Sequence, residues 1–365
     1  MSERLDRLID MMNKSPKYSK ERLLICEELV KVADSENNML YSFEGRKEII
    51  RIDKFTGDGF KGILTFPKLL WAGDEYLKKS NKQRKYVQFY IVWVLESMMY
   101  TCDDYYQIEY EKLNEIIEEY KVRCIEYGYS LRVYYKYMTL TYMDLEDVEK
   151  VKESFEKFKS CPRDEISDCE VCELRFEVEY ELFLNKYEKA LELADPIFKG
   201  QKKCTTALPL TYEHFLEYYI NNNMLEEAKE YREKMYRLIS KDEIYLSNMR
   251  IQFIYFAITE PKKGVKIFTK HLKWALSSNN ADDNFNFYIG AWMLWESFKF
   301  KEKREQCKLI LPEDTPFYKE SGIYLVDDII NYCKDQALSI GEKFDTRNRN
   351  TFYMNFINKM KKLVF

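Results

Sequence analysis

The sequence predicts an all-α protein built as a solenoid of helical hairpins, and three observations lead to this fold class. Small or apolar residues recur at the same place in a unit of about 38 residues, a period typical of helical repeats. The 11 glycines and 8 prolines make up about 5% of the 365 residues, against a usual share of about 12%, and sheets need more turn residues than helical hairpins do. Charged residues make up 33% of the chain, as expected for solvated helix faces. The recurring positions are Leu113, Val151, Ala190, Ala228 and Gly264.

Residues 1–103 are expected to form an irregular N-terminal helical module. Apolar residues at helical spacing from Leu5 to Met12 predict a first helix, which Ser15-Pro16 ends, and Ser19 is a suitable first cap for the next helix. The stretch 41–62 holds four of the eleven glycines, so we expect a loop with short helices there, with a small strand near Ile49–Ile52 as an option.

Two further helices are expected before the repeats begin, around Lys68–Lys79 and Tyr86–Cys102. The second of these contains the most apolar run of the chain, Tyr86–Tyr100. That run is too short and too polar to cross a bilayer, because it contains Gln88 and Glu96. It is therefore expected to be a buried core helix.

Residues 104–310 are expected to hold the repeats. The clearest unit has large, apolar, small and aromatic residues at fixed spacings, and these are Tyr212, Phe215, Leu216, Tyr219, Ala228 and Met235. This pattern resembles the tetratricopeptide repeat, although the units here are longer than the usual 34 residues. The resemblance implies a right-handed superhelical solenoid whose first helices line a concave groove. A weaker sixth hairpin is expected around Glu302.

Residues 311–365 are expected to cap the solenoid with a pair of helices, Tyr324–Phe344 and Phe352–Leu363, after a loop at Glu313–Tyr324. A polar string separates the two helices. It is interpreted either as a ligand site or as a cap, in which the aspartate caps the last helix and the first arginine forms an ion pair with the solenoid. Its candidate site residues are Asp345, Arg347, Asn348 and Asn350.

Composition argues against several classes of function. The net charge of −4 argues against nucleic-acid binding, because nucleic-acid-binding proteins normally carry a basic patch. The two histidines, His214 and His271, offer almost no material for histidine catalysis or for a histidine-rich metal site, and no phosphate loop or hydrolase motif is present, so no catalytic residue is predicted. The polar start of the chain and the nine scattered cysteines indicate a cytoplasmic protein with reduced thiols and no membrane association.

One cysteine spacing resembles a metal site. Cys169 and Cys172 form a C-x-x-C pair, with Cys161 before it and Cys204 after it. Four thiolates can make a structural zinc site. The alternative, which we favour because the pair lies in a helical segment without glycines, is that Cys169 and Cys172 pack one turn apart as small apolar residues. No metal and no cofactor are therefore predicted.

The predicted groove is the preferred binding site. Its first-helix positions combine carboxylates, amides and aromatic rings, a mixture that suits an extended peptide or protein segment. The groove positions are Glu213, Glu217, Asn221, Met249, Phe253, Asn284, Phe287 and Trp295.

The layout, a helical module followed by repeats, is similar to that of bacterial peptide-responsive regulators. That similarity implies a non-enzymatic regulator or scaffold that binds a peptide or protein in its groove. Two alternatives stay open at this point. One is a constitutive or immunity-type partner of a single protein, and the other is an enzyme with an unrecognised site in residues 40–80 or 345–350.

Overall fold

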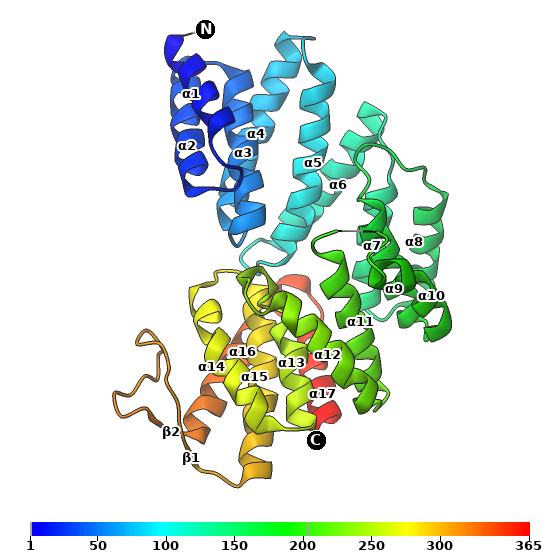
Figure 1. The fold of residues 1–365 in the computed structure, drawn as a ribbon. Coiled ribbons are helices and arrows are strands. Elements are labelled where there is room, and N and C mark those ends of the chain that lie inside the picture. The colour runs from blue at the N-terminus through cyan, green and yellow to red at the C-terminus, as the bar shows by residue number, and fades with distance from the viewer. Residues whose placement is uncertain (1, 203) are drawn as a thin grey trace. The chain divides into compact units, whose positions relative to one another are not determined.

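Seventeen α-helices account for most of the chain that the structure, a computed structural model, describes, namely residues 2–202 and 204–365 (Figure 1). The predicted all-α class is confirmed. Successive helices pack against one another in chain order, as expected for hairpins in a solenoid. The chain divides into two compact units, the first up to Thr139 with Glu149–Ser167 and the second Leu140–Val148 with Asp168–Phe365. The boundaries predicted at 103 and 310 stay a prediction.

The first unit contains the early hairpins, and helix α1 packs on α2, α2 on α3, α3 on α4, α4 on α5 and α5 on α6. The turn that joins α7 to α8 belongs to the second unit. The helices are α1 (Glu3–Lys14), α2 (Lys20–Ser35), α3 (Met39–Thr56), α4 (Phe60–Lys79), α5 (Arg84–Asp103), α6 (Tyr110–Tyr127), α7 (Arg132–Asp144) and α8 (Val148–Ser160).

The expected loop at residues 41–62 is wrong, because α3 and α4 cover this stretch and Ile49–Ile52 is a buried part of α3. Gly45 serves helix packing: a Cβ atom there would lie 2.7 Å from Val30 Cγ2 and 3.3 Å from the Cys26 carbonyl oxygen of α2. Gly59 has a φ of +85° and supports the short turn between the two helices. Gly59 therefore marks a tight turn and Gly45 a close contact between two helices.

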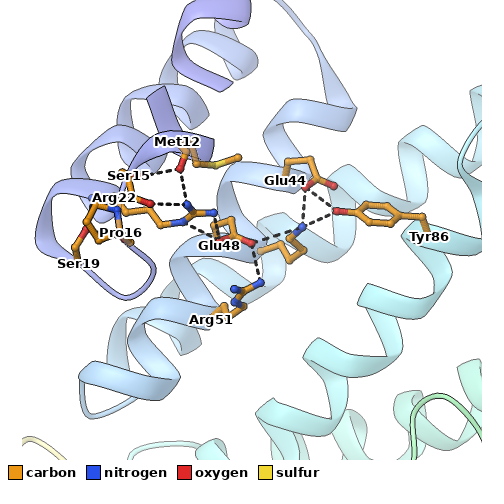
Figure 2. Close-up of polar contacts among 10 residues, drawn as sticks. Met12, Ser15, Pro16, Ser19, Arg22, Glu44, Glu48, Arg51 and Tyr86 are labelled. Atoms are coloured by element: carbon orange, nitrogen blue, oxygen red, sulfur yellow. Dashed lines mark hydrogen bonds and ion pairs between the residues drawn. The ribbon is translucent and has the colours of Figure 1, made fainter. Parts of the chain in front are cut away.

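A buried ion pair joins the first three helices (Figure 2). Arg22 of α2 donates from Nε and Nη2 to Glu48 Oε2 of α3 at 3.1 and 2.9 Å. Its Nη1 donates to the carbonyl oxygens of Met12 and Ser15, where α1 ends. Both charged side chains are more than nine-tenths buried. A buried charge without such partners would strongly destabilise the fold.

The same network continues toward α5 through Lys47. Its ammonium donates to Glu44 Oε2 at 2.7 Å and to the Tyr86 hydroxyl at 2.6 Å, and it lies 4.3 Å from the centre of the Tyr90 ring. Burial lowers the pKa of Lys47, but the charge of Glu44 and these hydrogen bonds outweigh it and raise the pKa to about 12. The lysine is therefore charged at neutral pH although it is buried.

The second unit contains the later hairpins and the predicted cap. Its elements are α9 (Glu170–Phe183), α10 (Tyr187–Phe198), α11 (Ala207–Asn221), α12 (Leu225–Ile239), a 3₁₀ turn η1 (Glu243–Tyr245), α13 (Met249–Ile258), α14 (Pro261–Ser277), α15 (Ala281–Glu302), β1 (Gln306–Lys308), β2 (Ile323–Leu325), α16 (Val326–Asn348) and α17 (Phe352–Val364).

The recurring positions of the sequence all lie on the second helices of successive hairpins. Leu113 is on α6, Val151 on α8, Ala190 on α10, Ala228 on α12 and Gly264 on α14, and every one is buried. A Cβ atom on Gly264 would lie 2.5 Å from Leu294 Cδ1 of α15. Small or apolar residues therefore occupy a buried position on each of these five helices.

The expected sixth hairpin around Glu302 is wrong, because α15 ends there. Lys303 follows with a φ of +51°, and the chain then forms the antiparallel strands β1 and β2. Pro312, Pro316 and Gly322 lie between the strands and prevent a regular helix. The partner helix of α15 is instead α16, and α17 packs on α13, α15 and α16 (Figure 1).

Helix α15 approaches α13 very closely at Gly290. A Cβ atom there would lie 2.8 Å from the Arg250 Cα atom and 2.9 Å from the Arg250 carbonyl oxygen. Both are backbone atoms, which cannot turn aside as a flexible side chain can. Only glycine fits this crossing without a shift of one helix.

We expect Gly290→Ala to lower the free energy of unfolding of the second unit by about 2 kcal/mol, because overpacking at the crossing outweighs the better helix propensity of alanine. Urea unfolding checks this. Ser339→Ala, on the exposed side of α16, is the control and should change stability by less than about 0.5 kcal/mol. Equal stability of the two variants would contradict the packing argument.

We expect Glu48→Ala to cost about 3 kcal/mol of stability in the first unit, because it leaves the Arg22 guanidinium buried without its carboxylate. Hydrogen exchange in α2 and α3 during urea unfolding measures the loss. The control is Glu28→Ala, which removes the exposed pair of Glu28 with Arg4 and should cost less than about 1 kcal/mol. Similar losses for the two variants would show that the buried pair has no special role.

Candidate functional site

The candidate site lies mainly on α9 and α11, which are first helices of hairpins in the second unit. Helix α11 packs between α9 and α13, and the last helix, α17, packs on α13. This arrangement places the polar faces of α9 and α11 near α17 and near the turn between α7 and α8, which belongs to the same unit. The predicted groove residues are distributed over α11, α13 and α15.

Four of the predicted groove residues are core residues, and this corrects their assignment. Met249, Phe253, Phe287 and Trp295 are completely buried. The ring centres of Phe253 and Phe287 lie 5.2 Å apart with an edge-to-face angle of 82°. These side chains fill the seam between α13, α14 and α15, because α15 and α17 cover the face of α13 that the repeat pattern alone leaves open.

Asn284 has a local structural role and does not line the hollow described below. Its Nδ2 donates to the Ser278 carbonyl oxygen at 2.9 Å, which fixes the turn before α15. Asn280 caps the same helix by accepting from the Asp283 backbone N–H at 2.9 Å. The expected place of Asn284 in the groove is therefore also corrected.

The three predicted residues of α11 share one face of that helix, at successive i, i+4 positions. Glu217 forms an ion pair with Arg250 of α13 through its Oε1 atom. Glu213 Oε2 accepts from Asn248 Nδ2 at 2.6 Å. Asn221, at the end of the helix, is exposed. The structure thus brings these three side chains together along one line.

His214 joins this face to α9. Arg175 Nη1 donates to His214 Nε2 at 2.8 Å, and Glu179 Oε2 lies 3.6 Å from the same nitrogen. Burial and the charge of Arg175 lower the pKa of His214, against the opposing effect of Glu179. A neutral imidazole with its proton on Nδ1 is the form that accepts from arginine.

The hollow beside this face has a volume of about 570 Å³. Four carboxylates and one lysine line it. The amide and aromatic side chains of its lining come from α9, α11 and the turns that follow them. The lining side chains that carry polar or aromatic groups are Asp144, Glu146, Glu179, Phe183, Asn185, His214, Glu217, Tyr218, Asn221, Asn222 and Lys359.

A second hollow of about 550 Å³ adjoins the first, and both are lined by Met143, Asp144, Glu146 and Lys359. Lys359 of α17 donates to Glu146 Oε1 at 3.1 Å, so this exposed ion pair lies where the hollows meet. The two adjoining hollows of the second unit are together called the groove.

The polar string at the end of α16 is mainly a cap. Asp345 accepts from the backbone N–H groups of Tyr353 and Met354 at 2.8 and 3.0 Å, which confirms the prediction that it caps the last helix. Asp345 and Arg347 are buried, and Asn348 is the last residue of α16. Asn350 lines the second hollow, so it is the member of this string that belongs to the groove.

Glu213 and Glu217 titrate differently although they are one turn apart. Burial, followed by the charge of Glu217, raises the pKa of Glu213 to about 7. Burial also acts on Glu217, but the charge and hydrogen bond of Arg250 outweigh it and lower the pKa of that carboxyl group. At neutral pH Glu217 is therefore the firmly charged partner of Arg250.

Sequence reasoning missed Arg175, His214, Arg250 and Lys359. A usable signal exists for the first three, because the polar partners are one repeat apart along the chain. The separations are 39 residues for Arg175 with His214, 33 for Glu217 with Arg250 and 35 for Glu213 with Asn248. Matching polar residues at the repeat period would have found these contacts.

No protein-family description, curated protein or solved structure matches this chain. Within the described residues, no helix combines the length and the apolar character that crossing a membrane requires.

We expect Glu213→Gln to stabilise the second unit at pH 8 by an amount on the order of 1 kcal/mol and to have little effect near pH 5. The folded-state pKa of Glu213 lies above its ordinary value of 4.5. Between these two values the folded protein keeps a proton that the unfolded chain has released, so stability falls as pH rises through this window. Thermal unfolding across pH measures the effect.

The matched control is Glu227→Gln, at an exposed position of α12. It should leave the pH dependence of the wild-type protein unchanged. A parallel pH profile for Glu213→Gln and wild type would contradict the raised pKa.

Proposed function

We propose that this protein is a non-enzymatic, cytoplasmic peptide- or protein-binding regulator or scaffold, which holds an extended segment in the groove of its second unit. The observation that carries the proposal is the pair of adjoining hollows, lined by carboxylates, amides and aromatic rings. An extended polypeptide has unpaired backbone groups, and amide side chains such as Asn221 and Asn222 can pair with them. Rings such as Tyr218 provide contact area at low entropic cost.

The charges of the groove favour a basic segment. Four carboxylates and one lysine line the first hollow. Glu146 is paired with Lys359 and Glu217 with Arg250, so a lysine or arginine of the ligand would extend ion pairs that the groove already contains. Such binding weakens as salt concentration rises.

The similarity in layout to bacterial peptide-responsive regulators supports the regulatory part of the proposal by analogy. In that view the occupied groove changes what the helices of the N-terminal region offer to a partner protein. The distribution of the polar network supports the binding part, because its members hold the walls of the hollow in one arrangement before a ligand arrives.

A degenerate library of ten-residue peptides, presented to the full chain, tests the proposal. We expect mass spectrometry of the retained peptides to show enrichment of lysine and arginine. Asn221→Ala should weaken binding of a selected peptide roughly 5-fold, because one hydrogen bond contributes about 1 kcal/mol. Fluorescence polarisation at two salt concentrations measures the loss of affinity in Asn221→Ala and the weakening of binding by salt.

The control is Asn114→Ala, at a half-buried position of α6 in the first unit. It should bind the selected peptide as tightly as the wild type. Retention of no peptide, or equal effects of the two substitutions, would overturn the assignment of the groove.

A further inference from the structure

Three cysteine sulfur atoms gather at one place in the second unit. The Sγ atoms of Cys169, Cys172 and Cys204 all lie within 4.8 Å of one another, and those of Cys172 and Cys204 are 3.5 Å apart. Cys161, which the sequence suggested as a fourth member, belongs to the first unit. Across residues 2–202 and 204–365, no other three cysteine, histidine or carboxylate side chains gather this closely.

The positions of the first two cysteines differ from the expected packing within a helix. Cys169 is exposed and precedes α9 as its N-cap, where its sulfur accepts from the Cys172 backbone N–H at 3.4 Å. Cys172 is half-buried in the first turn of the same helix. Cys204 comes from the loop before α11. The sulfur atoms therefore converge from two segments that are more than 30 residues apart.

The three cysteines are free thiols, and the distances between their sulfur atoms are compatible with a shared metal ion. In a tetrahedral site with Zn–S bonds of about 2.3 Å, the sulfur atoms lie about 3.8 Å apart. A disulfide requires a sulfur–sulfur distance of about 2.05 Å. The observed spacing of 3.5 to 4.8 Å brackets the value for a metal site.

The surroundings favour thiolates that share a cation. The starts of α9 and α11 lie beside the cluster, and helix N-termini stabilise negative charge. A divalent cation at the centre of the three sulfur atoms would offset the mutual repulsion of three thiolates at this spacing.

One side of the cluster is apolar. Cys204 packs against a small group of buried residues, Val171, Ile197 and Ala207. On the exposed side, Lys202 Nζ donates to Glu170 Oε2 at 3.2 Å and ties the loop to the start of α9. A dry wall of this kind limits access of water to bound metal ions.

We propose that Cys169, Cys172 and Cys204 bind one Zn²⁺ ion as three thiolates. The thiols release their protons to solvent as the ion binds, and a water molecule takes the fourth position. The ion then holds the loop before α11 against the start of α9. This site lies outside the groove residues of the proposed function.

Cobalt binding to the reduced, metal-free full chain tests the proposal. One equivalent of Co²⁺ should produce a sulfur-to-cobalt charge-transfer band, and Zn²⁺ should displace it and raise the melting temperature. Cys172→Ser and Cys204→Ser should each weaken Zn²⁺ binding by about 100-fold or more. Circular dichroism of each variant before metal addition shows that it is folded.

The matched control is Cys161→Ser, which removes a half-buried thiol of the first unit and should bind cobalt as the wild type does. The proposal is overturned if the reduced wild type gives no charge-transfer band, or if the band keeps its intensity in Cys172→Ser. A Cys172–Cys204 disulfide in the native protein, with no metal binding after reduction, would assign the cluster to redox chemistry instead.

Discussion

The close crossing of α15 over α13 at Gly290 is the constraint on which the second unit depends. The backbone of Arg250 lies where a side chain at position 290 would begin. This contact sets the distance between the two helices, and the aromatic rings of Phe253 and Phe287 fill the space that remains. The side chain of the same residue, Arg250, forms the ion pair with Glu217. A packing constraint in the core therefore positions a charge at the groove.

Both units place charged groups in poorly hydrated surroundings and satisfy them with partners from neighbouring helices. In the first unit Arg22 pairs with Glu48, and in the second Arg250 pairs with Glu217. The first pair is almost completely buried and contributes to the fold alone. Glu217 is about one-third exposed, so it can also meet a ligand. The two ion pairs have the same chemistry and differ in burial. The more buried pair suits a structural role, and the more exposed pair suits recognition.

The sequence predicts the helices well, because the repeat period and the apolar spacing act locally. It predicts the role of the glycines less well. Gly45 lies at a close contact between two helices, and residue composition alone cannot distinguish such a glycine from one in a loop. Of the residues predicted to line the groove, Glu217 and Asn221 of α11 line the first hollow, whereas those of α13 and α15 are buried in the core or hold a turn. Other helices of the same unit cover the predicted faces of α13 and α15, and the repeat pattern does not show these contacts. Contacts between distant segments, such as Cys172 with Cys204, follow from tertiary packing.

The position of the last helix, α17, explains why the groove lies on α9 and α11 and not on α13. A repeat pattern by itself predicts the same exposure for α9, α11 and α13. Helix α17 packs on α13 (Figure 1). The Arg250 guanidinium lies 5.1 Å from the centre of the Phe356 ring. The face of α13 is thereby closed, while those of α9 and α11 stay open beside Lys359. The cap covers the exposed end of the solenoid and, by doing so, forms one wall of the site.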